Sequence, residues 1–200
     1  MSVAGIIQIP DLNQFTYGTG SGEINEEEKE EPKIDKIDRL RNLFSTSGTV
    51  NSVRAIVLVH IHNHPHVLLL EKNSNKSTVI PGGILTPGED DESGLQRLLS
   101  KKMCLVEGAY EIGEMLATWY RPQFTNQFYP YLPVHITMPK EIERWYLVSL
   151  PEKGSIAISP KYRLCAVPFY DLQEYDTKTF GNQIVNIPLL VSRFNIQPIH

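Results

Sequence analysis

The residues best suited to chemistry lie in one stretch, in which a glycine-rich loop from Pro81 to Glu89 leads into a predicted helix from Asp90 to Met103. Glycines let a ligand approach the backbone closely, and a helix that follows such a loop favours anions. Lys101 and Lys102 add two positive charges near the end of the helix. The stretch is therefore a candidate site for a ligand that carries phosphate groups.

The spacing within this stretch resembles the Nudix box, a loop and helix in which glycine, glutamate, arginine and aliphatic residues stand at fixed positions. The matching residues span 23 positions, and they are Gly83, Glu89, Arg97, Leu99 and Leu105. So many matches in a loop followed by a helix make a specific signal. The resemblance implies an α/β protein with the Nudix fold: a mixed β-sheet sandwiched between helices in α-β-α layers, with an N-terminal extension and helix.

Nudix hydrolases bind a divalent cation through three carboxylates on one face of this helix, and the same positions here hold Leu98, Lys101 and Lys102. Magnesium requires oxygen ligands, whereas ammonium groups repel the cation and offer no lone pair. Without the metal, attack on a diphosphate lacks its Lewis acid and its activated water. Cys104 also replaces the glycine of the box. These departures predict a Nudix protein that is not an enzyme and holds no metal or other cofactor.

A second distinctive segment, from Trp119 to Tyr131, holds six of the chain's 18 aromatic residues. Aromatic residues dominate cores and interfaces alike, so this density leaves a packed loop and a binding surface equally open. The run from Trp119 to Glu141 closely resembles the small, 25-kDa subunits of cleavage factor Im. The resemblance extends to three further segments, Pro65–Leu70, Pro81–Asp90 and Ser192–Asn195, and covers the chain from about Phe15 onward.

That resemblance implies a nuclear, non-catalytic protein of pre-mRNA 3′-end processing that forms a homodimer. It implies binding of single-stranded pre-mRNA at UGUA elements upstream of the poly(A) site, by base stacking and hydrogen bonds to base edges. The implied protein partners are a larger cleavage factor Im subunit with an RRM, and poly(A) polymerase or other 3′-end processing factors. No membrane partner is implied.

The resemblance also places binding residues along this chain. The expected RNA-binding residues are Glu28, Lys36, Arg54, Lys76, Ser77, Thr78, Ile80, Phe180 and Gly181. The expected contacts to a second copy or to a protein partner are Tyr129, Tyr131 and Leu190, although packing in the core explains each of these three about as well.

Several of these positions depart from the family. The family has an arginine at Lys36, a glutamate at Arg54, a tyrosine at Phe180, and two stacking aromatics at Ser77 and Thr78. Loss of a stacking ring costs about 1–3 kcal/mol per base. Added basic groups instead attract phosphates without regard to sequence. We therefore hypothesise that this chain binds RNA with a weaker or altered base preference.

Four histidines alternate along the chain: His60 lies near the end of the predicted strand Val53–Ile61, and His62, His64 and His66 follow it. On one continuous strand they would align like a metal site. Pro65 indicates a turn between this strand and a second one at His66–Glu71, as in a hairpin. The turn breaks the alignment, so the sequence favours a structural role for these histidines. Both predicted strands are apolar on both faces, which favours helices on each side of the sheet.

The 200 residues carry a net charge of −4, with six carboxylates gathered between Glu23 and Glu31, so net charge neither supports nor excludes nucleic-acid binding. The longest apolar stretches fall far short of the roughly 20 residues that span a bilayer. We expect Cys104 and Cys165 to be reduced core residues, because their spacing suits neither a disulfide framework nor a metal site.

One domain with a short arm is predicted: a flexible N-terminal arm over residues 1–25 and a Nudix-like domain over residues 26–200. Helices are expected behind Pro32, ending before Ser45, and at Ile184–Phe194, where Pro188 lies in the first turn or makes a kink. The remaining expected strands are Trp145–Leu150, Ser155–Ile158 and Tyr162–Val167.

Three alternatives stay open. The first is an active pyrophosphohydrolase with unusual metal ligands among Glu89, Asp90, Asp91 and Glu92. The second is a module that binds a nucleotide or dinucleotide polyphosphate without hydrolysing it. The third is a scaffold whose only role is dimerisation and partner binding.

Overall fold

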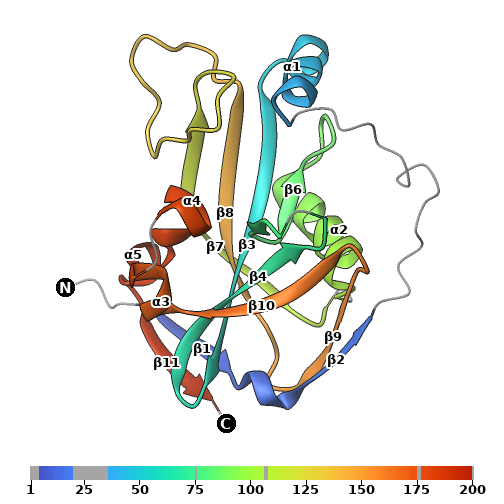
Figure 1. The fold of residues 1–200 in the computed structure, drawn as a ribbon, viewed down its shortest axis with the longest axis vertical. Helices are drawn as coiled ribbons and strands as arrows, with labels where there is room; N and C mark the ends of the chain where they lie inside the picture. The colour runs from blue at the N-terminus through green and yellow to red at the C-terminus, as the bar shows by residue number, and fades with distance from the viewer. Residues whose placement is uncertain (1–4, 20–35, 75, 106–107, 175–176, 200) are drawn as a thin grey trace.

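The structure is a computed structural model that describes residues 5–19, 36–74, 76–105, 108–174 and 177–199. Its centre is a mixed sheet of seven strands (Figure 1). Five strands lie in the order β10 (Tyr162–Pro168), β4 (His64–Lys72), β3 (Val50–Ile61), β8 (Glu141–Ser149) and β7 (Glu111–Arg121). β5 (Thr78–Val79) pairs with β4, and β6 (Gly82–Ile84) pairs with β3. β3 and β8 run parallel, whereas the other pairs in this sheet are antiparallel.

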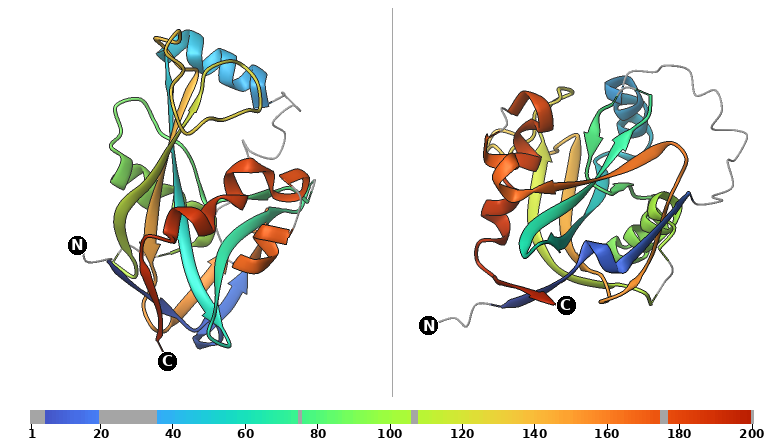
Figure 2. Two further views of the ribbon diagram at one scale, coloured as in Figure 1. Left: turned by 90° about the vertical axis from the view of Figure 1, so that its left-hand side faces the viewer. Right: turned by 60° about the horizontal axis from the view of Figure 1, so that its bottom comes forward.

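Helices cover both faces of the sheet, as Figure 2 shows from two sides. α2 (Asp91–Met103) lies on one face, and α3 (Phe169–Glu174), α4 (Thr177–Val185) and α5 (Ile187–Val191) lie on the other. β3 explains this arrangement, because its alternate side chains enter two separate apolar clusters. Val53, Ala55 and Val57 pack with Leu95 and Leu99 of α2, whereas Ile56 and Leu58 pack with Ile184 and Ile187. The predicted α-β-α Nudix architecture is confirmed.

α1 (Lys36–Ser47) stands at one end of the sheet beside the long loop over residues 122–140 (Figure 1). The ring of Phe44 meets the ring of Phe124 edge to face at 5.7 Å, and the Lys140 ammonium lies 4.1 Å from the centre of the Phe44 ring. The helix ends at Ser47, later than predicted. Pro32 and the acidic run Glu23–Glu31 lie outside the described residues.

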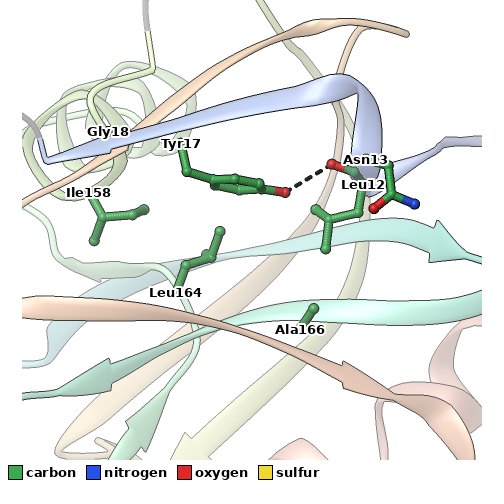
Figure 3. A pocket seen from close by; sticks show the side chains of 7 residues that line it. All are labelled: Leu12, Asn13, Tyr17, Gly18, Ile158, Leu164 and Ala166. Carbon is green, nitrogen blue, oxygen red and sulfur yellow. Dashed lines mark hydrogen bonds between the residues drawn. The ribbon is translucent and has the colours of Figure 1, made fainter.

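The N-terminal segment departs from the prediction of a separate arm. β1 (Ile6–Pro10) pairs in parallel with β11 (Asn195–Ile199), and β2 (Phe15–Thr19) pairs in parallel with β9 (Gly154–Ile158). Between β1 and β2, Leu12–Gln14 forms a short 3-10 helix, and the Tyr17 hydroxyl donates to the Leu12 carbonyl at 3.0 Å (Figure 3). Ile7, Ile9 and Phe15 are buried. Residues 5–19 are therefore packed on the domain, because these few apolar anchors enter its core, while the predicted boundary at residue 25 lies outside the described residues.

The predicted hairpin forms, but the position of its turn was wrong. His62 and Asn63 make the turn with φ of 50° and 64°, so Pro65 lies inside β4 opposite His60. Two residues with positive φ match the right-handed twist of paired strands, and Asn and His tolerate this conformation better than most residues. His60 and His66 are buried on facing strands. Within the described ranges, no three His, Cys, Asp or Glu side chains gather as a metal site requires.

The predicted closing helix is divided. α4 ends at Val185 and α5 begins at Ile187, with Pro188 in its first turn. After Val191 the chain extends into β11, a strand the sequence did not predict. The other predicted strands are present, although β8 begins at Glu141 and not at Trp145. Cys104 and Cys165 are free and half-buried, so neither is a full core residue. No helix in the described ranges has the length and apolarity to cross a membrane.

Candidate functional site

A fork between β3 and β4 creates the candidate site. β3 pairs with β4 only from Leu58 to Ile61, and nearer its start it pairs with β6 from Ser52 to Arg54. The chain between β4 and α2 fills the gap between the two splayed strands. Gly82 permits this close approach, because a Cβ at its position would lie 2.1 Å from the Val53 carbonyl oxygen. This glycine was expected to admit a ligand, and it instead admits the neighbouring strand.

A cavity of 380 Å³ opens beside Arg54, and we name it the amide pocket after the Asn and Gln side chains in its wall. Its lining comes from α1, β3, the segment around β5, the loop after β7, β8 and α4. The residues are Lys36, Arg54, Thr78, Val79, Ile80, Asn126, Gln127, Phe128, Tyr129, Glu143, Gly181, Asn182, Gln183 and Ile184. Five of the nine predicted RNA-binding residues, distant in sequence, thus meet in one cavity.

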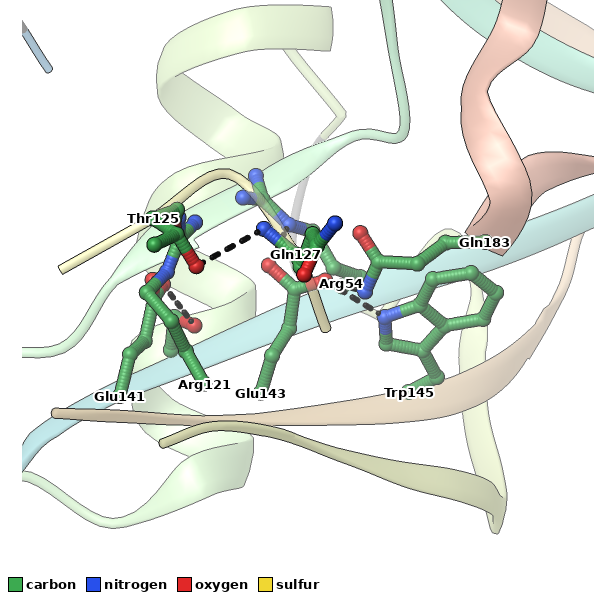
Figure 4. A network of polar contacts seen from close by, with 9 residues as sticks. Arg54, Arg121, Thr125, Gln127, Glu141, Glu143, Trp145 and Gln183 are labelled. Carbon is green, nitrogen blue, oxygen red and sulfur yellow. Dashed lines mark hydrogen bonds and ion pairs between the residues drawn. The ribbon is translucent and has the colours of Figure 1, made fainter. Parts of the chain in front are cut away.

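Arg54 and Glu143 form an ion pair in the wall of the amide pocket (Figure 4). The Arg54 Nε donates to the Glu143 Oε2 at 2.8 Å, with only 17% and 4% of the two side chains exposed. The other carboxylate oxygen accepts from the Trp145 indole at 2.9 Å and from the Gln183 amide at 3.1 Å. Burial alone would raise the pKa of Glu143, but the Arg54 charge and the hydrogen bonds from Trp145 and Arg54 outweigh burial and lower the pKa.

Gln183 therefore has a fixed orientation, because its amide nitrogen is committed to Glu143. A glutamine whose NH₂ group is held in this way presents its carbonyl oxygen as an acceptor. On the opposite wall, the Gln127 Oε1 accepts from the Tyr129 hydroxyl at 3.1 Å, which leaves its NH₂ group as a donor. The amide pocket thus offers both donors and acceptors, which is what recognition of a base edge requires.

The long loop brings two aromatic rings to the amide pocket. Its base is fixed by reciprocal backbone hydrogen bonds between Tyr120 and Tyr129, at 2.8 and 2.9 Å. The Arg121 guanidinium lies 4.1 Å from the centre of the Phe128 ring and donates to the Thr125 carbonyl. Arg121 is in turn paired with Glu141 at 2.9 Å, and both residues are buried (Figure 4). Phe128 and Tyr129 are held by a rigid support and line the pocket.

The other predicted site residues lie elsewhere. Lys76 is exposed with φ of 53°, and Ser77 is half-buried beside it, just before the residues that line the amide pocket. Phe180 precedes Gly181 on α4, and its side chain is outside the described part of the structure, as is Glu28 as a whole. Gly181 has φ of 79° and interrupts α4, so its backbone, which has no side chain in the way, borders the pocket.

Of the expected partner contacts, Tyr129 lines the amide pocket, whereas Tyr131 is 60% exposed with its ring 5.9 Å from that of Tyr129. Leu190 packs partly buried against the core. No role was predicted for Asn126, Gln127 or Gln183, which line the amide pocket. The many aromatic residues around Asn126 and Gln127 were the one feature of the sequence that pointed to this loop. Only the fold shows that the loop and α4 both line the pocket beside Arg54.

A larger cavity of 890 Å³ lies on the other side of Arg54, and we name it the basic cleft. Nine basic residues line it: Lys36, Arg39, Arg54, Lys72, Arg97, Lys101, Lys102, Arg121 and Lys161. Glu141 is the one carboxylate among its described lining residues. Leu98, Lys101 and Lys102, the positions of the metal-binding carboxylates in Nudix hydrolases, all face this cleft, and the Lys102 ammonium donates to the Gly82 carbonyl.

The acidic residues near the basic cleft are engaged in structural contacts. Glu89 accepts from the Arg97 Nε at 2.7 Å and from the backbone N–H of Thr86 at 2.7 Å, and these hydrogen bonds lower the pKa of Glu89 to about 2. Asp90 caps α2 by accepting from the backbone N–H of Ser93. Asp91 accepts from the Tyr146 hydroxyl at 2.6 Å, and burial together with this bond raises the pKa of Tyr146 to about 12. All three lie outside the lining of the cleft.

Known proteins resemble this chain over almost its whole length. Residues 5–194 match the family NUDIX_2, described as nucleotide hydrolase. The chain is 37% identical over 188 residues to the cleavage and polyadenylation specificity factor subunit 5 of Dictyostelium discoideum, covering 92% of each protein. It is 36% identical over 203 residues to the pre-mRNA cleavage factor Im 25 kDa subunit 2 of Arabidopsis thaliana, covering 100% of this chain and 99% of that one. A Nudix hydrolase from M. smegmatis, RenU, shares the fold with a TM-score of 0.50 at 10% identity, over 71% of this chain and 83% of that chain.

Proposed function

The chain belongs to the Nudix-fold family of pre-mRNA cleavage factor Im 25-kDa subunits, and from that premise we propose that it is an RNA-binding subunit of the pre-mRNA cleavage and polyadenylation machinery. The observation that carries the proposal is the amide pocket, where Lys36, Arg54, Thr78, Ile80 and Gly181 converge from separate segments. Its amides, its rings and its positive charge suit an unstacked base and its phosphate.

The same proposal assigns no hydrolase activity to the protein. Hydrolysis by a Nudix enzyme needs oxygen ligands for a divalent cation, and the ligand positions hold Leu98 and two lysines. Of the four carboxylates that an unusual enzyme could use as replacements, Glu89, Asp90 and Asp91 bond instead to Arg97, to Ser93 and to Arg144 with Tyr146. The fourth, Glu92, is exposed in the first turn of α2 and does not line the basic cleft. Their geometry favours binding over catalysis.

Protein partners are the second part of the proposal. We expect a nuclear homodimer that associates with a larger, RRM-containing subunit and with poly(A) polymerase or other 3′-end processing factors, as the family membership implies. The outer part of the long loop supports a protein contact, because Tyr131, Val134 and Met138 are exposed at 60%, 103% and 54%. Exposed aromatic and methionine side chains of this kind are typical interface anchors. We propose that Tyr131 and Leu190 contact a protein partner. We assign Tyr129 to the wall of the amide pocket instead.

The test is fluorescence anisotropy of the purified protein with a UGUA-containing RNA and a permuted control, at two salt concentrations. Base recognition in the amide pocket predicts a preference for UGUA that survives higher salt, because hydrogen bonds to base edges are screened less than phosphate contacts. Since Ser77 and Thr78 lack stacking rings, we expect that preference to be modest. Binding of both RNAs alike, with loss at higher salt, would leave specificity to a partner subunit. Binding of neither RNA would contradict the proposal.

A further inference from the structure

The basic cleft concentrates charge that the chain as a whole does not have. Nine of the 19 basic residues in the sequence line this one cavity, although the net charge of the protein is −4. They come from α1, β3, β7, α2, the end of β4 and the turn before β10, which are brought together only by folding. A local surplus of this size attracts polyanions and raises their rate of association.

The carboxylate in the cleft does not offset this surplus. One oxygen of Glu141 accepts from the Arg121 Nε at 2.9 Å and the other accepts from the Ser52 hydroxyl at 2.8 Å. The carboxylate therefore neutralises Arg121 in the wall of the cleft and not the other basic residues. Arg54 and Arg97 pair with Glu143 and Glu89, which lie outside the lining. The remaining basic residues of the lining outnumber the carboxylates of the same lining.

Helix stability explains only part of this arrangement. Lysines in the last turn of a helix interact favourably with its dipole, which accounts for Lys101 and Lys102. Arg39, Lys72 and Lys161 lie on other elements and gain nothing from that dipole. Their convergence on one cavity therefore favours a ligand with several negative charges along its length.

The amide pocket and the basic cleft adjoin one another, because Lys36 and Arg54 line both. A strand of RNA that leaves the amide pocket past these two residues enters the cleft directly.

We propose that the basic cleft holds the phosphate backbone of the nucleotides that flank the bases read in the amide pocket. The lysines at the former metal positions thus contact RNA phosphates in a sequence-independent manner. This inference rests on the proposed function, since it requires that RNA occupies the amide pocket. It predicts that the protein contacts nucleotides beyond the recognised bases, and that the affinity contributed by those nucleotides falls as the salt concentration rises.

The experiment compares three ligands by fluorescence anisotropy: a four-nucleotide UGUA RNA, the same RNA with abasic ribose-phosphate flanks on either side, and the abasic oligomer alone. Abasic flanks add phosphates without bases. The variant replaces three exposed residues of the cleft, Arg39→Gln, Lys101→Gln and Lys161→Gln, and the matched control is Lys153→Gln, an exposed lysine outside both cavities. Thermal unfolding followed by circular dichroism checks that each variant folds.

For the native protein we expect the flanks to tighten binding about tenfold, and the triple variant to lose that gain while its affinity for unflanked UGUA falls less than about twofold. The salt slope for the flanked RNA should fall by about 0.7 for each lost phosphate contact, hence by about 2 in the triple variant. The Lys153→Gln control should match the native protein.

Several results would overturn the inference. If the flanks do not raise the affinity for UGUA RNA, the cleft does not bind the flanking phosphates. The same conclusion follows if the triple variant still binds flanked RNA more tightly than unflanked RNA. A dinucleotide polyphosphate added as a competitor tests the small-molecule alternative: competition that the triple variant loses, with no effect of the flanks, assigns the cleft to a small molecule. Failure of the proposed function looks different, because UGUA then has no advantage over its permutation while the abasic oligomer still binds through the cleft.

Discussion

The two cavities on either side of Arg54 differ in chemistry although they share part of one wall. The amide pocket measures 380 Å³ and combines amides, two aromatic rings and a buried ion pair. The basic cleft measures 890 Å³ and is lined by cations from six segments. Directional hydrogen bonds in a small cavity distinguish bases, whereas a broad positive surface recognises phosphates of any sequence.

Under the proposed function, this difference indicates how a Nudix fold would serve RNA binding. In Nudix hydrolases, carboxylates on α2 hold a cation, and in this chain lysines stand at those positions and supply positive charge directly. The acidic group of the site lies instead on β8, where Glu143 orients Arg54 and Gln183. Each cavity should therefore respond to different substitutions, and the following predictions test that separation.

The largest effect is expected in the wall of the amide pocket. Glu143→Ala leaves the Arg54 guanidinium buried without its counter-ion, and removal of one partner of a buried pair costs about 3 kcal/mol. Urea unfolding at pH 7 should show this loss of stability, whereas Glu152→Ala, at an exposed glutamate, should unfold like the native protein. A loss of less than about 1 kcal/mol would show that Arg54 finds water or another partner, and that the pocket wall is not rigid.

The next prediction restores a group that the amide pocket lacks. Thr78→Phe places an aromatic ring at a lining position where the family has one, and a stacked base gains about 1–3 kcal/mol. The affinity for UGUA RNA, measured by anisotropy, should therefore rise about tenfold with no change in salt slope. Thr78→Val is the matched control, because it keeps the side-chain volume without adding a ring. An equal gain for the permuted RNA would show stacking without base discrimination.

Much of the fold was predictable because its signals are local. The helix Asp90–Met103 was predicted from its apolar period, and the structure confirms it as α2, with Asp90 as its N-cap. β1 and β2 were missed because each has only a few buried residues and pairs with a strand more than 130 residues away. Pairing at such distance leaves no periodic signal in either segment.

The candidate site was predictable only in part. The resemblance to a family supplied Arg54, Thr78 and Gly181, because single positions can be matched in sequence. Gln127 and Gln183 could not be found in this way, since their importance comes from orientation by Tyr129 and Glu143. The basic cleft was hidden for the same reason, because its charges are spread over more than a hundred residues of a chain with little net charge.

A smaller effect is expected at the rim of the basic cleft. Glu89→Gln releases Arg97 from its pair and should cost about 0.5–1 kcal/mol of stability at pH 7, because the Arg97 side chain is 44% exposed and solvent screens the pair. The native carboxylate titrates at about 2 when folded and near 4.5 when unfolded. Its contribution is therefore complete above pH 4.5 and is lost as the pH falls through 2.

Urea unfolding of the native protein and of Glu89→Gln at pH 7, 4.5 and 2 checks this pH dependence, with Glu92→Gln as an exposed control. A difference between the two proteins that stays constant down to pH 2 would contradict the role of the ionised carboxylate. The same variant sharpens the comparison of the cavities, because the released Arg97 should tighten binding of flanked RNA slightly and leave base preference unchanged.

The smallest effect is expected where α2 ends. Cys104 follows the helix with φ of 46° and ψ of 31°, a left-handed conformation that costs a residue with a Cβ about 1–2 kcal/mol. Glycine avoids this cost but loses more entropy on folding, so Cys104→Gly should raise the free energy of unfolding by about 0.5 kcal/mol. Cys104→Ala should give no gain in stability, because alanine keeps the Cβ.

The same variant tests whether the basic cleft is rigid, because Lys101 and Lys102 lie on the turn before Cys104. A change in RNA affinity with Cys104→Gly would show that the end of α2 moves when the cleft binds phosphate. Unchanged affinity means that the cleft is preformed.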